Sequence, residues 1–184
     1  MKRYRATLAY DGTAYCGFQR QRSGLPSVQA EVERALGVIA HQPVGLLAAG
    51  RTDSGVHATG QIISFDLTWR HGSEKLLRAL NANLPDDVVV REVQETGATF
   101  HPRFDALRRR YEYFIQECPD GIRRPFTRTR YWQLLETLDM EQMNLAAAHL
   151  VGEHDFATFG TPLRRAKAPS VNYLWPTGDV KLIC

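Results

Sequence analysis

Hydrophobic positions in the first half of the chain follow strand and helix periods in turn. Strict alternation or short apolar runs predict strands at 3–10, 44–49, 61–67 and 88–93. Between these strands, apolar residues at helical spacing predict two helices. The first helix is expected to follow the cap residue Ser27 and to stop before Pro43. The second is expected to follow the cap residue Ser73 and to stop before Pro85.

The predicted order is β-α-β-β-α-β, the ferredoxin-like pattern, in which two helices cover one face of an antiparallel sheet. A second half begins near Phe104. Its predicted elements are strands at 110–115, near 129–135 and at 171–175, and a helix capped by Asp139 and closed by Gly152. One more helix and further strands would be needed for a second complete repeat. We therefore expect an α+β fold with two ferredoxin-like halves, 1–103 and 104–184, each with an antiparallel sheet and the second half incomplete.

Composition places the chain among ordinary globular proteins, with 43% apolar and 23% charged residues. The apolar runs are too short to span a bilayer, and no apolar signal-peptide core follows Met1, so we expect a cytoplasmic protein without a membrane segment. The three cysteines are Cys16, Cys118 and Cys184. Their scattered spacing argues against a disulfide framework and against a thiolate zinc site.

The formal net charge is only +3, but arginines crowd one third of the chain. They are Arg103, Arg108, Arg109, Arg110, Arg123, Arg124, Arg128 and Arg130, interleaved with Tyr111, Tyr113, Phe126, Tyr131 and Trp132. Arginine makes forked contacts to phosphate and aromatic rings stack on bases, so this mixture is typical of an RNA-binding surface. A solvated basic face would have the same composition, and composition alone leaves both interpretations open.

Residues 50–58 concentrate the side chains that can do chemistry, in the order Gly-Arg-Thr-Asp-Ser-Gly-Val-His-Ala. The segment follows a predicted buried strand, and its glycines permit tight turns close to a ligand. Asp53 could serve as a covalent nucleophile, with Arg51 beside it keeping the carboxylate ionised. The same residues would also suit a purely structural turn, in which Asp53 caps the turn and Arg51 pairs with it.

Three other interpretations of single residues are open at this point. Asp53 and His57 could hint at a metal, but two ligands are too few for a closed site, and we expect no metal. Ser54 and His57 could form a hydrolase pair, although no nucleophile-elbow motif accompanies them. Tyr111, on a predicted alternating strand, is by default an aromatic residue of the sheet face.

The segment 50–58 resembles the signature motif of the tRNA pseudouridine synthase A family. Other segments resemble the family in the same order along the chain: 9–19, 27–29, 81–85, 100–106, 109–113 and 152–156. The resemblance covers roughly residues 3–160, and several ordered motifs are far more specific than any one of them alone.

The resemblance implies a pseudouridine synthase fold and the isomerisation of uridine to pseudouridine at positions 38–40 of the tRNA anticodon stem-loop. Asp53 would be the nucleophile, Arg51 would pair with it and help hold the flipped nucleotide, and Tyr111 would stack on the uracil. A base inside a stem must be flipped out to react, at a cost of a few kcal/mol. The implied partner is the tRNA anticodon arm, the implied full-length assembly is a homodimer, and no cofactor is implied.

After about residue 161 the sequence departs from the family pattern. The family continues with a segment of the type Phe-x-His-His-Met-Val-Arg-Asn, and nothing like it follows residues 171–175 or appears in the tail 176–184. This predicts a chain that is truncated or frameshifted at its C-terminus. It also leaves a second hypothesis open, that of a non-catalytic RNA-binding or inactive fragment of such an enzyme.

Overall fold

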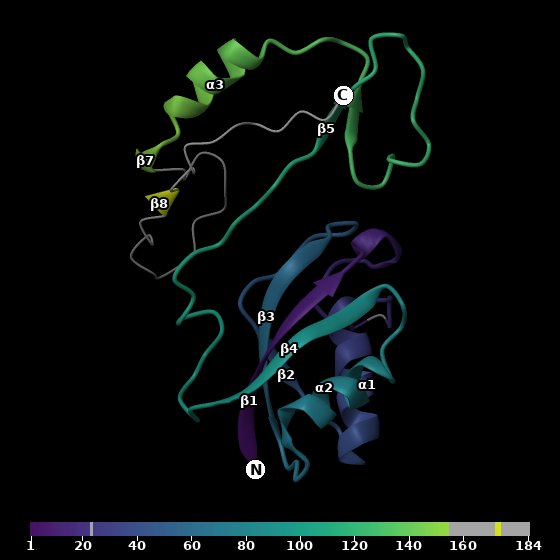
Figure 1. Ribbon diagram of the computed structural model, residues 1–184, viewed down its shortest axis with the longest axis vertical. Helices are drawn as coiled ribbons and strands as arrows, with labels where there is room; N and C mark the ends of the chain where they lie inside the picture. The colour runs from purple at the N-terminus through teal and green to yellow at the C-terminus, as the bar shows by residue number, and fades with distance from the viewer. Residues whose placement is uncertain (23, 155–171, 174–184) are drawn as a thin grey trace. The chain divides into compact units, whose positions relative to one another are not determined.

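The computed structural model describes residues 1–22, 24–154 and 172–173 of the chain (Figure 1). Two compact units divide the chain, residues 1–110 and 111–184. The boundary expected from the sequence lay after Arg103. The first unit reaches Arg110 because Arg109 returns to the sheet, where its Nη2 donates to the Ala49 carbonyl oxygen at 2.9 Å.

The first unit is built on one four-stranded sheet. Its strands are β1 (Lys2–Tyr10), β2 (Leu46–Ala48), β3 (Ala58–Leu67) and β4 (Val88–Thr96), in the order β2-β3-β1-β4. Every neighbouring pair is antiparallel. The sheet therefore confirms the ferredoxin-like pattern that the sequence predicts for this half.

Two helices, α1 (Val28–Ala40) and α2 (Gly72–Asn81), lie on one side of this sheet (Figure 1). Ser27 caps α1 as predicted, because its Oγ accepts the Ala30 N–H at 3.4 Å. The predicted cap of α2 is wrong. The chain enters that helix through Gly72, whose φ of 78° favours glycine, so Ser73 lies in the first turn and His71 takes the cap position without a side-chain bond.

The core lies between the helices and the sheet. On β1 the buried face carries Tyr4, Ala6, Leu8 and Tyr10, as the alternation predicts. These side chains pack with apolar residues of β3, α1 and α2, which are Ile63, Phe65, Leu67, Val28, Val32, Leu36, Leu76 and Leu80. Burying each large apolar side chain contributes about 1.5–3 kcal/mol to folding, so this cluster fixes the frame of the sheet.

Strand β1 loses regular pairing near its C-terminal end. Its register with β4 shifts between Thr7 and Leu8, and its register with β3 shifts between Leu8 and Tyr10. Such irregularities bend a strand and re-aim its side chains, and they are common next to active sites. The end of the sheet where they occur is the end from which the loops 11–18 and 49–57 emerge.

The second unit contains shorter elements. They are β5 (Ile115–Glu117), β6 (Trp132–Leu134), α3 (Met140–Ala148), β7 (Gly152–Glu153) and β8 (Asn172–Tyr173). Asp139 caps α3 as predicted, because its Oδ1 accepts the Gln142 N–H at 3.0 Å. The helix ends at Ala148, before the predicted stop at Gly152. The predicted strand 171–175 is described only at Asn172–Tyr173, and residues 155–171 and 174–184, with Cys184, lie outside the described part.

Two predictions for this unit are wrong. Strand β5 begins only at Ile115, and β5 pairs with β6 in parallel rather than antiparallel. In the described part of the chain the backbone of residues 111–113 makes no strand pairing, and an alternating sequence without a partner strand does not form a strand on its own. The parallel pair is joined by a long connection, residues 118–131, which such a pair requires. Gln133 Nε2 holds this connection by donating to the Arg124 carbonyl oxygen at 2.6 Å.

Candidate active site

Asp53 lies in the loop between β2 and β3, and the residue before it is fixed at two atoms. The carbonyl oxygen of Thr52 accepts the Phe18 N–H at 2.9 Å. The hydroxyl of Thr52 lies 2.9 Å from the hydroxyl of Tyr10, the last residue of β1. Both contacts tie the loop 49–57 to the loop that leaves β1.

The residues after Asp53 are held from the same neighbouring loop. The Tyr15 carbonyl oxygen accepts the Gly55 N–H at 3.3 Å and the Ser54 hydroxyl at 3.2 Å. The turn itself closes through main-chain atoms, with the Val56 N–H donating to the Asp53 carbonyl oxygen at 3.2 Å. The backbone on each side of Asp53 is therefore anchored, and none of these contacts uses its carboxylate.

The two loops approach so closely that glycine is required at two positions. A Cβ atom at Gly12 would come 2.1 Å from the Val56 carbonyl oxygen. A Cβ atom at Gly17 would come 2.9 Å from the Thr52 carbonyl oxygen, and Gly17 also has a φ of 99°. Side chains at these positions would push the loops apart.

The start of the loop is fixed by β3 and by Arg109. The Ala49 N–H donates to the Ile62 carbonyl oxygen at 2.8 Å, and Gln61 Nε2 donates to the Gly50 carbonyl oxygen. Arg109 Nη2 donates to the Ala49 carbonyl oxygen at 2.9 Å. Hydrogen bonds therefore fix the backbone at Ala49 and Gly50, directly before the segment that carries Arg51 and Asp53.

His57 closes the other end of the loop. Its Nδ1 lies 3.2 Å from the Gly12 nitrogen and 3.1 Å from Asp11 Oδ1. Through these contacts His57 holds its end of the loop against the turn after β1, which is a structural role. Within the described ranges no group of three His, Cys, Asp or Glu side chains could hold a metal ion.

The hydrolase interpretation fails on the direction of one hydrogen bond. Ser54 has a single hydroxyl proton, and it donates that proton to the Tyr15 carbonyl oxygen. A serine nucleophile would instead donate to the histidine that activates it. The Ser54 side chain therefore helps to hold the loop in place through its hydrogen bond to Tyr15.

Two buried tyrosines support the loop as neutral hydrogen-bonding groups. Burial raises the pKa of Tyr10, against the opposing effect of its bond to Thr52. Burial, together with the hydrogen bond to Asp87, raises the pKa of Tyr15 well above its ordinary range. Both hydroxyls therefore keep their protons at neutral pH and remain available as donors.

The side chains of Arg51 and Asp53 are both exposed. The predicted ion pair between them is not formed, and neither side chain has a hydrogen bond or ion pair to any residue that the structure describes. Two exposed charges gain only about 0–1 kcal/mol by pairing, which is too little to hold them together. The structural-turn interpretation, which needs Asp53 as a side-chain cap, is therefore wrong. Among the described residues, the Asp53 carboxylate and the Arg51 guanidinium therefore have no partner, on a loop whose backbone is anchored.

A sequence model of the tRNA pseudouridine synthase family matches residues 6–105. The matched range includes the whole sheet of the first unit from Ala6 onward, both loops and the Arg51–Asp53 segment. The chain belongs to the tRNA pseudouridine synthase family.

Individual relatives agree. The tRNA pseudouridine synthase A of Neisseria meningitidis serogroup B is 43% identical over 169 residues, which cover 91% of this chain and 63% of the relative. That of Pseudothermotoga lettingae is 46% identical over 159 residues, 86% of this chain and 64% of the relative. That of an Exiguobacterium species is 42% identical over 159 residues, 86% of this chain and 63% of the relative. The chain thus spans less than two thirds of the length of these curated relatives.

In this member of the pseudouridine synthase family, the third predicted site residue belongs to the second unit. Tyr111 is its first residue, and its side chain is 67% exposed and outside any strand. It is therefore not the sheet-face aromatic residue that alternation suggested. That Tyr111 joins Arg51 and Asp53 in one site stays a prediction.

The arginine-rich segment contains side chains of two kinds. Arg109 and Arg124 have internal partners: Arg109 binds main-chain carbonyls, and Arg124 Nη2 lies 2.6 Å from Asp120 Oδ2. The Arg124 guanidinium lowers the pKa of Asp120. Four exposed guanidinium groups have no partner among the residues described, namely those of Arg103, Arg108, Arg123 and Arg128. These four are available to an anionic partner.

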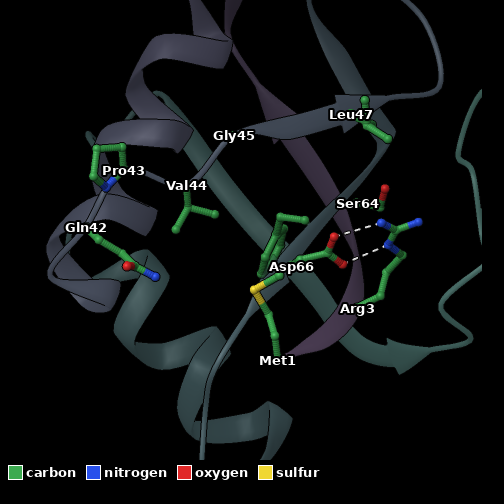
Figure 2. A pocket seen from close by; sticks show the side chains of 10 residues that line it. Met1, Arg3, Gln42, Pro43, Val44, Gly45, Leu47, Ser64 and Asp66 are labelled. Atoms are coloured by element: carbon green, nitrogen blue, oxygen red, sulfur yellow. Dashed lines mark hydrogen bonds and ion pairs between the residues drawn. The ribbon is translucent and has the colours of Figure 1, made fainter.

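A pocket of about 280 Å³ lies at the start of β1 and is lined by Met1, Arg3 and Asp66 among others (Figure 2). No residue of the loop 49–57 lines it. Arg3 and Asp66 in its lining are joined by two parallel contacts, Nε to Oδ1 at 2.8 Å and Nη2 to Oδ2 at 2.7 Å. Arg3 Nη1 is also occupied by the carbonyl oxygens of Ala98 and Phe100. Arg3 and Asp66 of this pocket are therefore paired with each other. No helix of the described ranges is long and apolar enough to cross a membrane.

Proposed function

We propose that this protein isomerises uridine to pseudouridine in the anticodon stem-loop of tRNA, at positions 38–40, with Asp53 as the nucleophile. The observation that carries the proposal is the state of Asp53. Its backbone is anchored through Thr52 on one side and through Gly55 on the other, while its carboxylate is exposed and without a side-chain partner in the described structure. A nucleophile needs this combination of fixed position and free electron pairs.

The chemistry needs no oxidant, reductant or metal, because substrate and product are isomers. Asp53 forms a covalent bond to the flipped nucleotide, either to C1′ of the ribose or to the uracil ring, and the bond between C1′ and N1 of uracil breaks with its electron pair left on the uracil. The uracil turns and C5 bonds to C1′. If Asp53 is bonded to C1′, its bond breaks in this step; if it is bonded to the ring, its bond breaks after C5 has rejoined the ribose. C5 then loses its proton to solvent and N1 gains one.

Arg51 and Tyr111 complete the proposed site. Arg51 lies two residues from Asp53 and its guanidinium is free in the described structure, so it can bind the phosphate of the flipped nucleotide by forked hydrogen bonds. Tyr111 offers an exposed ring for stacking on the uracil. Stacking and phosphate contacts together offset the few kcal/mol that flipping costs.

The partner in this proposal is the tRNA anticodon arm. Binding of a polyanion is supported by four guanidinium groups that have no partner in the described part of the chain, those of Arg103, Arg108, Arg123 and Arg128. A homodimer for the full-length protein is part of the same proposal, since it accompanies the family resemblance. A cytoplasmic location is also proposed, on the basis of the sequence pattern described above.

Tritium release tests the reaction directly. Replacement of the C5 hydrogen is intrinsic to the isomerisation, so tRNA labelled with tritium at uridine C5 should lose its label to water when mixed with the protein. Anticodon stem-loops with one uridine at position 38, 39 or 40 should all react, and a stem-loop without uridine there should bind but release nothing. Binding of every stem-loop without release from any of them would contradict the proposal and support the alternative, an RNA-binding fragment without catalysis.

A further inference from the structure

One partly buried hydrogen bond outside the loop of Asp53 fixes the segment that contacts this loop. Tyr15, which is 6% exposed, donates its hydroxyl to Asp87 Oδ1 at 2.6 Å. Asp87 also accepts the Asp11 N–H at its carbonyl oxygen, at 2.9 Å. The turn from Asp11 to Tyr15 is thus held at both ends by one residue, which stands directly before β4.

The main-chain carbonyl oxygen of Tyr15 binds the part of the loop that follows Asp53. It accepts the Ser54 hydroxyl at 3.2 Å and the Gly55 N–H at 3.3 Å. These are the two residues that follow Asp53. A displacement of the Tyr15 main chain therefore moves Ser54 and Gly55, and Asp53 moves with them.

We infer that Tyr15 and Asp87 are positioning residues for the proposed reaction, acting through the loop that presents Asp53. The inference rests on the proposed function, because it assigns two further residues to that reaction. Hydrogen bonds to an ionised carboxylate are stronger than neutral ones. The raised pKa of Tyr15 agrees with the geometry, because it keeps the hydroxyl protonated as the donor.

The local consequence is measurable by amide hydrogen exchange in the 184-residue chain. Tyr15→Phe keeps the buried ring and removes only the hydroxyl. Loss of a hydrogen bond to a charged group should speed exchange of the Phe18 and Gly55 amides roughly ten- to hundredfold. The Ala6 amide, in the middle of β1, should change much less. Tyr4→Phe is the matched control, because Tyr4 is a buried tyrosine at the other end of β1, and it should leave the loop amides unchanged.

The catalytic consequence separates positioning from plain stability. Turnover measured by tritium release should fall about ten- to hundredfold in Tyr15→Phe and in Asp87→Ala, since small displacements of a reacting group cost this much. The KM for tRNA should stay unchanged, because neither residue is proposed to touch the RNA. Asp87→Asn keeps an acceptor oxygen for the Tyr15 hydroxyl, and it should restore most of the turnover lost in Asp87→Ala.

Hydrogen exchange and tritium release can each contradict the inference independently. Loop amides in Tyr15→Phe that exchange at the wild-type rate would overturn it, as would unchanged turnover in both Tyr15→Phe and Asp87→Ala. Faster exchange at every amide alike would show a general loss of stability and would also overturn it. A wild-type chain that releases no tritium would contradict the proposed function and the catalytic part of the inference with it. The exchange rates would then still decide whether the Tyr15–Asp87 bond holds the loop.

Discussion

Gly17 lies so close to Thr52 that a Cβ atom at residue 17 would come 2.9 Å from the Thr52 carbonyl oxygen. That oxygen already accepts the Phe18 N–H at 2.9 Å. The contact joins the loop after β1 to the residue directly before Asp53. The position of the proposed nucleophile therefore depends on the absence of a side chain at residue 17.

Gly17→Ala should both destabilise the protein and displace Asp53. The alanine would carry the cost of a positive φ, about 1 kcal/mol, and a clash with main-chain atoms that cannot rotate away. We expect the free energy of unfolding to fall by about 2 kcal/mol or more, with turnover falling more than tRNA affinity. Chemical denaturation and tritium release measure the two effects.

Gly24→Ala provides the matched control for this substitution. Gly24 has a φ of 71°, but a Cβ atom there would meet nothing within 4 Å. Its cost should be limited to the backbone term, about 1 kcal/mol, with turnover unchanged. Equal losses in the two variants would show that the contact between residue 17 and Thr52 is unimportant.

Alkaline pH should destabilise the protein through Tyr10 and Tyr15. Burial raises the pKa of both in the folded state, whereas in the unfolded chain a tyrosine titrates near pH 10. Above about pH 10 the unfolded chain loses protons that the folded chain keeps. The free energy of unfolding should therefore fall as pH rises, by up to about 1.4 kcal/mol per pH unit for each tyrosine.

Denaturation at pH 8 to 11 tests this sign. Tyr15→Phe should be less stable than the wild type at pH 8, yet its stability should decline less steeply above pH 10. Tyr113→Phe, at a tyrosine that is 86% exposed, should follow the wild-type curve. A steeper decline in Tyr15→Phe than in the wild type would show that the Tyr15 hydroxyl is not protected in the folded state.

The arginines without a partner among the described residues, Arg103, Arg108, Arg123 and Arg128, should make tRNA binding dependent on salt. Each phosphate that they neutralise should change the slope of log affinity against log salt by roughly −0.7 to −0.9. Arg123→Ala or Arg128→Ala should each make the slope shallower by about that amount. Arg124→Ala should change it less, because that guanidinium is already paired with Asp120. A slope that none of these variants changes would mean that the arginines form only a solvated face.

Local sequence patterns predicted the start of α1, the start of α3 and the buried face of β1, because these features are locally encoded. Ser27 and Asp139 cap their helices through bonds to residues three positions ahead. The alternation of β1 places Tyr4 and Leu8 in the core. Such features depend on spacing that is visible in the sequence itself.

Features that depend on distant partners were not predicted. The parallel pairing of β5 with β6 and the non-strand state of Tyr111 follow from which backbone groups meet in space. The Tyr15–Asp87 bond joins residues far apart in sequence, and nothing in the spacing of either residue indicates it. The Arg51–Asp53 pair was predicted from proximity along the chain, but exposure leaves both charges better solvated apart.

The assignment of Asp53 as the nucleophile is tested most directly by Asp53→Asn, with Asp86→Asn as a control at another exposed aspartate. The amide keeps the shape of the carboxylate but cannot form the covalent bond. Tritium release from tRNA labelled at uridine C5 should disappear in Asp53→Asn, while tRNA affinity and the free energy of unfolding stay close to the wild type. Asp86→Asn should release tritium at the wild-type rate. Continued turnover in Asp53→Asn, at a rate comparable to that of the control, would contradict the account.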